Sequence, residues 1–242
     1  MWLSRAQIKA DASMDALSPV LIPGDDNKRI GVAHRIVWTM FPGDPKAKRD
    51  FLWREEKPGQ FIILSRRQPT ASSFLDLESK RFAPDISVDS KLMFRLRANA
   101  TMDKKQPGQK RSKRVDVVMD ALNTIPQGKR AGPRKQELGW METEEFQTLP
   151  PQAPLAWLQR QGANKGFEVN EAVVLGYDRV RLPRDSNNAT KKKTSDIQFS
   201  ALEFDGVLKI TDQGKFIHAL ADGFGRAKAF GCGLMLIKRM AS

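Results

Sequence analysis

The sequence predicts an α+β protein, and three observations lead to this fold class. Segments whose apolar residues alternate with polar ones, as in half-buried strands, are interspersed with segments whose apolar residues recur at helical spacing. The segments follow one order in each half of the chain: strand, helix, strand, strand, helix, strand. The length of 242 residues suits two small domains, since domains most often have about 100 to 150 residues. We therefore expect one domain at residues 1–100 and a second at residues 101–242.

The first predicted strand and helix lie at the start of the chain. Residues 1–9 alternate between two sets of side chains, which suits a strand with one solvent-exposed face. A helix is predicted over 27–41 because Ile30, Val37 and Phe41 recur at helical spacing. The asparagine at its first position can cap the helix, and the Pro-Gly pair that follows ends it.

A hairpin, a second helix and a fourth strand complete the first half. Residues 51–56 and 61–66 are expected to be two strands joined by the turn-forming sequence Lys-Pro-Gly-Gln. A weaker helical pattern covers 70–79. Alternation over 91–99 then predicts the last strand of this half.

The second half repeats this order with longer insertions. Its expected elements are a strand, a helix, two strands, a helix and a strand, at 114–119, 153–162, 171–182, 196–210, 212–222 and 233–239. An insertion at 126–154 contains a possible short element at 136–148. In each half the order is that of the split βαβ unit, a four-stranded antiparallel sheet with two helices on one face. The sequence therefore predicts two tandem ferredoxin-like (RRM-like, βαββαβ) domains.

The charge of the chain points to a polyanionic partner. There are 41 Lys and Arg against 28 Asp and Glu, a net charge of +13, which attracts polyanions over long range. Nucleic acid is the leading candidate, and a membrane surface is weaker, because no apolar run of about 18 residues and no signal-like start is present. One cysteine, Cys232, excludes an internal disulfide, and two histidines leave no plausible zinc cage. We expect a cytoplasmic protein without metal or other cofactor.

Glycines are concentrated near the end of the chain, in the sequence GFGRAKAFGCG at 223–233. A dinucleotide-binding loop lies between a strand and the N-terminus of a helix, whereas here the predicted helix precedes the glycines and the strand follows them. The phosphate-binding pattern GxxxxGK[ST] is absent. A nucleotide cofactor is therefore not expected. The glycines either shape a tight crossover or let the backbone approach an RNA phosphate, with Arg226 and Lys228 beside them.

The pattern GxGxAKxxGCGL at 223–234 resembles the C-terminal signature of CasE, the CRISPR repeat-processing endoribonuclease family of the type I-E Cascade complex. "MWLSR" at the start, "RDFLWREEK" at 49–57 and "FRLRAN" at 94–99 are similar to the same family in order and spacing, while 101–196 is looser. The resemblance implies two ferredoxin-like domains that bind the stem-loop of the repeat RNA. It also implies metal-free cleavage at the 3′ base of the stem, giving a 2′,3′-cyclic phosphate and a 5′-hydroxyl. By the same resemblance, the product is expected to stay bound, with other Cascade subunits as partners.

The expected catalytic residue is His34, which occupies the position of the family's catalytic histidine. Histidine is the natural proton carrier for this reaction, because its unperturbed pKa of about 6.5 lies near working pH. From the residue pattern alone a hydrogen-bonded core role is the commoner outcome. His218 falls on a solvated helix face. The family often carries a tyrosine three residues before the catalytic histidine, and here that position is Gly31. Nearby cations that can stabilise the developing negative charge are Lys28, Arg29 and Arg35.

RNA is expected to be held by basic residues in two clusters and on one strand face. The clusters contain no aromatic residues, which suits a duplex held through its phosphates better than a single strand stacked on rings. The first cluster includes Lys110, Arg111, Lys113 and Arg114, and the second includes Arg181, Arg184, Lys191, Lys192 and Lys193. Arg95 and Arg97 share one face of the strand at 91–99. In the glycine-rich segment the candidates are Gly225, Arg226, Lys228, Gly231 and Gly233.

Two other functions remain open from the sequence. The stretch "PDISVDSK", with Pro84, Asp85, Asp89 and Lys91, is similar to a metal-dependent nuclease pattern. Its two acidic residues are too close in sequence for the hairpin that usually separates them, so we expect no metal site there. A non-cleaving RNA-binding scaffold would share the charge, domains and glycine-rich segment. Only His34 and a cleavage assay distinguish that scaffold from an enzyme.

Overall fold

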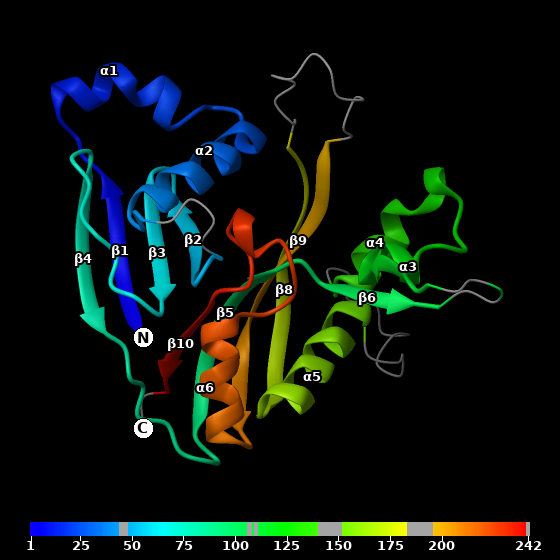
Figure 1. The fold of residues 1–242 in the computed structure, drawn as a ribbon. Helices are drawn as coiled ribbons and strands as arrows, with labels where there is room; N and C mark the ends of the chain where they lie inside the picture. The colour runs from blue at the N-terminus through cyan, green and yellow to red at the C-terminus, as the bar shows by residue number, and fades with distance from the viewer. Residues whose placement is uncertain (44–47, 106–107, 109–110, 140–151, 183–195, 241–242) are drawn as a thin grey trace.

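The computed structural model describes residues 1–43, 48–105, 108, 111–139, 152–182 and 196–240. Within these residues the chain forms two four-stranded antiparallel sheets and one small two-stranded sheet (Figure 1). The predicted α+β class is confirmed. Numbered from the first to the fourth strand along the chain, both large sheets have the order 4-1-3-2.

The first sheet is built from the N-terminal residues. Its strands are β1 (Trp2–Ile8), β2 (Phe51–Lys57), β3 (Gln60–Ser65) and β4 (Leu75–Arg81), and α1 (Ala12–Leu21) and α2 (Asp26–Thr39) lie between β1 and β2. Asp25 caps α2, because its carboxylate accepts a hydrogen bond of 2.8 Å from the Lys28 amide. Ala33 and Val37 of α2 are buried in one core with Phe61 and Ile63 of β3. This packing fixes α2 against one face of the sheet.

The second sheet contains the complete βαββαβ order. Its strands are β5 (Lys91–Ala98), β8 (Phe167–Leu182), β9 (Ile197–Ile210) and β10 (Met235–Arg239), and its helices are α5 (Ala153–Lys165) and α6 (Gln213–Asp222). Leu158 of α5 and Leu220 of α6 are buried in one core with Phe204 of β9. Both helices therefore cover the same face of the sheet, as the split βαβ unit requires.

A smaller group of elements lies between β5 and α5. It comprises β6 (Thr101–Lys104), β7 (Lys113–Asp116), α3 (Val117–Ala121), a 3₁₀ turn at Gln127–Lys129 and α4 (Ala131–Glu137). The segment predicted as one strand at 114–119 is split, because the Asp116 carboxylate accepts a hydrogen bond of 2.8 Å from the Met119 amide and caps α3. Gln136 of the predicted element at 136–148 lies in α4, and most of the rest falls outside the described residues.

One further element was predicted wrongly, and another was placed in the wrong sheet. Residues 70–79 were expected to be helical, but β4 begins at Leu75 and pairs with β1 along its whole length, so no helix lies between β3 and β4. The strand at 91–99 is confirmed, but β5 pairs with β9 and β10 and is the first strand of the second sheet. We therefore propose that the change from one domain to the other lies between Arg81 and Lys91 instead of at residue 100. The helix α1 was not predicted.

The structure also bears on the membrane alternative. In the part of the chain that it describes, no helix combines the length and the apolar character needed to cross a bilayer.

Candidate functional site

The glycine-rich segment at 223–234, called the glycine loop below, connects α6 to β10. Its ends are joined by a hydrogen bond of 3.0 Å from the Phe224 amide to the Gly233 carbonyl. The Gly233 amide donates to the carbonyl of Arg97 on β5 at 2.7 Å, and the Arg226 amide donates to the carbonyl of Asn99 at 3.2 Å. These bonds attach the glycine loop to the end of β5.

The other side of the glycine loop lies against the first sheet. The indole N–H of Trp53 on β2 donates to the carbonyl of Ala229 at 3.2 Å. The glycine loop therefore connects the two large sheets, and we call the region where it meets α2, β2, β5, β8 and β9 the seam.

Two loop glycines show why this residue type is needed there. Gly225 and Gly231 have φ angles of +68° and +77°, which side chains rarely adopt. A Cβ at Gly225 would lie 2.6 Å from the Asn99 carbonyl oxygen, whereas one at Gly231 would lie 3.4 Å from the Trp53 ring, an ordinary contact. Close packing at the seam thus accounts for Gly225. The predicted contact of Gly225, Gly231 and Gly233 with RNA is not tested by this geometry.

His34 lies on α2 at the seam, half-buried. Its ring centroid is 5.7 Å from that of Phe230 in the glycine loop and 6.4 Å from that of Trp38. Phe230 in turn stacks on Phe199 of β9, with 5.6 Å between ring centroids. The His34 Nδ1 atom is buried and makes no hydrogen bond of normal geometry within the described residues. Elements from both sheets therefore surround an imidazole that has spare hydrogen-bonding capacity.

The surroundings of His34 lower its pKa below the usual 6.5. Burial is the largest cause, because it penalises the charged imidazolium, and the positive charges of Arg49 and Arg35 act in the same direction. The backbone of Ala229 raises the pKa in part. His34 is therefore mainly neutral at neutral pH, which is the form that accepts a proton.

Arg49 is a site residue that the sequence reasoning did not single out. It lies just before β2 and is half-buried, and its Nη1 atom is buried without a hydrogen-bond partner among the described residues. Its charge lowers the pKa of Lys228 in the glycine loop as well as that of His34, so it lies near both. In the sequence, the only indication of a role for Arg49 was its position in the stretch at 49–57 that resembles the CasE family. We call Arg35, Arg49 and Lys228 the cationic cluster: Arg35 and Arg49 lie near His34, and Lys228 lies near Arg49.

Two predicted cations of α2 are free of ion pairs within the described residues. Lys28 and Arg35 are exposed, and with Gly31 they line an open groove of about 520 Å³ that reaches Leu182 at the end of β8. Apart from the backbone of α2 and the two adjacent residues, no described atom lies within 4 Å of the place that a Cβ at Gly31 would take. Arg29 is half-buried instead and pairs with Asp26 at 2.6 Å and Glu55 at 3.3 Å.

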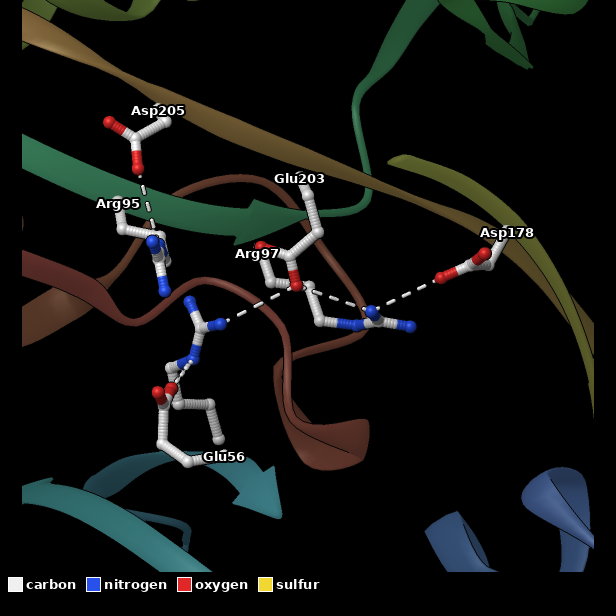
Figure 2. A network of polar contacts seen from close by, with 7 residues as sticks. Glu56, Arg95, Arg97, Asp178, Glu203 and Asp205 are labelled. Carbon is white, nitrogen blue, oxygen red and sulfur yellow. Dashed lines mark hydrogen bonds and ion pairs between the residues drawn. The ribbon is translucent and has the colours of Figure 1, made fainter. Parts of the chain in front are cut away.

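Arg95 and Arg97 are paired with carboxylates across the second sheet (Figure 2). Arg95 contacts Asp205 at 3.3 Å, and Arg97 contacts both Glu203 at 3.3 Å and Asp178 at 3.2 Å. Much of their charge is therefore balanced inside the protein, and their contact with phosphate stays a prediction.

A buried arginine of the first sheet joins this network. Arg54 of β2 pairs with Glu56 and, at 3.5 Å, with Glu203 of β9. Its side chain is 8% exposed. This ion-pair network connects the two sheets at the seam.

The two basic clusters are placed differently relative to α2. The β6–β7 hairpin, with exposed Lys113 and Arg114, extends away from α2, and Arg114 pairs with Asp103 at 3.0 Å (Figure 1). Arg181 at the end of β8 pairs with Asp196 at 2.6 Å, and its amide donates to the Asn27 side chain of α2 at 3.0 Å. The second cluster therefore begins beside α2. Lys110, Arg184, Lys191, Lys192 and Lys193 lie outside the described residues, while Arg111, Arg226 and His218 are exposed.

The acidic pair considered for a metal lies away from the seam. Asp85 and Asp89 are in the loop between β4 and β5, and Asp85 pairs with Arg239 at 3.2 Å. Across the described ranges, no group of three or more His, Cys, Asp or Glu side chains has the arrangement of a metal site.

Comparison with known proteins gives consistent results over almost the whole chain. The model of a family described as "CRISPR associated protein" matches residues 1–239. The curated protein "CRISPR system Cascade subunit CasE" of Escherichia coli (strain K12) is 26% identical over 225 residues, which cover 90% of this chain and 96% of that protein.

Solved structures share the fold. The crystal structure of the CRISPR-associated protein Cas6e from Escherichia coli K-12 has a TM-score of 0.60 and 21% identity, covering 99% of this chain and all of that one. The CRISPR endoribonuclease Cse3 bound to a 19-nucleotide RNA has a TM-score of 0.65 and 20% identity, covering 98% of this chain and all of that one. Thermus thermophilus Cse3 bound to an RNA representing a pre-cleavage complex has a TM-score of 0.64 and 20% identity, with 98% of each chain covered. These matches confirm the predicted tandem ferredoxin-like fold.

Proposed function

Because the chain belongs to the CRISPR-associated protein family, we propose that it is an endoribonuclease that processes CRISPR repeat RNA. It binds the stem-loop of the repeat, cuts the precursor at the 3′ base of the stem and keeps the product as a subunit of a cytoplasmic Cascade complex. The printed names of the relatives, a Cascade subunit and an RNA-bound endoribonuclease, support this proposal. The observation that carries it is the half-buried, mainly neutral His34 next to a cationic cluster at the seam.

The proposed reaction uses a nucleophile that belongs to the RNA. The His34 imidazole accepts the proton of the 2′-hydroxyl upstream of the cut, and the 2′-oxygen attacks the adjacent phosphorus. Arg49, Lys228 and Arg35 stabilise the negative charge that develops on the phosphorane oxygens. The bond to the 5′-oxygen breaks, and that oxygen takes a proton from water. The products are a 2′,3′-cyclic phosphate and a 5′-hydroxyl, and no step uses a metal.

The RNA backbone approaches His34 along the groove at Gly31. Lys28 and Arg35, which have no ion pair among the described residues, supply positive charge there, and the absence of a side chain at Gly31 leaves room for a sugar or a phosphate. The basic residues near the end of β8 extend this surface toward the stem, through Arg181 and the cations that follow it in sequence. The duplex is held through its phosphates, so affinity falls steeply with added salt.

Replacing His34 with alanine tests the proposal. We expect the single-turnover cleavage rate of His34→Ala to fall by about 10² to 10⁴, while affinity for the stem-loop stays within a few-fold. His218→Ala is the matched control, because His218 is exposed on α6. A single 2′-deoxy substitution upstream of the cut should block the wild type, and a chelator of divalent metals should not. A His34→Ala protein that folds and cuts at the wild-type rate would eliminate this mechanism.

A second function, that of a non-cleaving RNA-binding scaffold, is favoured by one observation. The position of the family's tyrosine is Gly31, where the structure has open space instead of a phenol. If the protein is such a scaffold, the wild type should bind the repeat stem-loop tightly and produce no cut RNA at any pH. Cleavage by the wild type that depends on His34 would exclude it.

A further inference from the structure

The seam contains a cleft of about 480 Å³ between α2 and β8. Its walls include Asn27 and Ile30 of α2, Tyr177 and Val180 of β8, and Phe230 of the glycine loop. Phe230 also contacts His34, with 5.7 Å between ring centroids. The cleft is therefore next to the imidazole to which we assign catalysis, on the side of the glycine loop.

The charged groups of the cleft are balanced, although the chain carries a net charge of +13. Three carboxylates and three guanidinium groups line it: Asp26, Glu55, Asp178, Arg29, Arg97 and Arg179. A phosphate in the cleft would meet as many negative groups as positive ones. The cleft thus differs from the groove at Gly31, where the two cations Lys28 and Arg35 face a single carboxylate, Asp25. Its ligand is expected to be polar and nearly neutral.

Several of these groups are held in place before any ligand binds. Arg29 pairs with Asp26 and Glu55, and Arg97 pairs with Asp178. A guanidinium has five donor hydrogens and a carboxylate has about four acceptor sites, so each pair leaves capacity for a ligand. The Tyr177 hydroxyl donates to Asp116 at 3.0 Å, which fixes its ring as part of the wall. Donors and acceptors are therefore offered together in a preorganised site.

We propose that this cleft binds one unpaired nucleobase of the substrate RNA, next to the cut, and that guanine fits it best. The proposal rests on the proposed function. Unpaired RNA bases are recognised by stacking on aromatic rings and by hydrogen bonds to their edges, and the cleft supplies both through Phe230, Tyr177 and its ion pairs. Guanine presents donors at N1 and N2 that suit a carboxylate, and acceptors at O6 and N7 that suit an arginine. The volume lies at the lower end of small-molecule sites, about 300 to 1,000 Å³, so it suits one nucleoside and excludes a duplex.

The test uses stem-loop RNAs in which single unpaired nucleotides flanking the cut are replaced by abasic residues. These keep the backbone and remove one base. Stacking on protein rings contributes a factor of about 5 to 150 per base, so one abasic position should weaken binding to the wild type about 10-fold. Guanine should be preferred there over the other bases. Asp178→Asn leaves the rings but weakens a hydrogen bond to the base edge, which contributes a factor of about 2 to 12, so it should reduce this abasic penalty to about 3-fold.

Glu168→Gln is the matched control. Glu168 lies on the same strand, β8, and pairs with Lys209 at 3.2 Å, but it does not line the cleft. It should leave the abasic penalty unchanged. The cleft proposal alone is overturned if both variants lose the abasic penalty to the same extent. It is also overturned if no abasic position weakens binding although the intact stem-loop is bound and cut. If the intact stem-loop is neither bound nor cut, the proposed function fails instead.

Discussion

A pair of glycine substitutions in the glycine loop separates backbone strain from steric collision. Gly225→Ala and Gly231→Ala both place a side chain at a positive φ angle, +68° and +77°. That conformation costs a non-glycine residue about 1 to 2 kcal/mol, offset by up to about 1 kcal/mol because alanine restricts the unfolded chain. The nearest atom to the new Cβ of Gly231→Ala is in the Trp53 ring, at 3.4 Å, which is an ordinary contact. This variant should therefore lose only about 0.5 to 1 kcal/mol of unfolding free energy.

Gly225→Ala carries an added cost. Its Cβ would lie 2.6 Å from the Asn99 carbonyl oxygen, so the loop and the end of β5 must separate. The hydrogen bond from the Arg226 amide to that carbonyl, now 3.2 Å, is then strained or lost. A hydrogen bond of this kind typically contributes about 0.5 to 1.5 kcal/mol net to the unfolding free energy, and its loss costs more where a buried group is left without a partner. Strain and collision together predict a loss of about 2 to 4 kcal/mol.

Thermal unfolding followed by circular dichroism measures the difference. For a chain of this size each kcal/mol shifts the melting temperature by about 2 to 4 °C, so Gly225→Ala should melt several degrees below Gly231→Ala. Lys238→Ala, on the exposed part of β10, is the control and should melt with the wild type. Equal melting temperatures for the two glycine variants would refute the assignment of Gly225 to close packing.

Four further predictions concern the charges at the seam. Since burial lowers the pKa of His34, the single-turnover cleavage rate should rise with pH through a midpoint below 6.5, and a midpoint above 6.5 would contradict the assignment. The same shift makes the unfolded state bind the proton more readily, so urea unfolding should show stability falling as pH drops below 6.5. Arg49→Gln should slow cleavage by about 10² to 10³ and raise that midpoint, whereas exposed Arg5→Gln on β1 should do neither. Arg54→Met leaves Glu56 without its partner and Glu203 with Arg97 alone, and should lower the unfolding free energy by about 1.5 to 3 kcal/mol in urea titrations.

Local patterns predicted most of the elements, and long-range pairing decided the failures. Leu75 and Leu77 alternate with charged residues, but the helical pattern assigned to 70–79 obscured that alternation. The ladder between β4 and β1 decides the outcome, and it joins residues about 70 apart in sequence. The strand at 91–99 was predicted correctly, but its sheet depends on β9, more than 100 residues later.

The candidate site was predicted in part for the same reason. Alternation placed Arg95 and Arg97 on one face of β5, and the alternating burial along that strand agrees. Their carboxylate partners on β9 depend on the register of that strand pair, which the sequence pattern does not contain. Arg49 lies outside any periodic segment, so only its packing near His34 and Lys228 identifies it.

The position of the glycine loop makes the environment of His34 depend on the docking of the two sheets. His34 belongs to α2 of the first sheet, whereas Ala229 and Phe230, which shape its environment, follow the helices and most of the strands of the second sheet in sequence. A chain that has folded only its first sheet would carry the imidazole exposed and without Lys228 nearby. On the proposed function, cleavage therefore requires the second sheet to be folded and the glycine loop to be packed against α2.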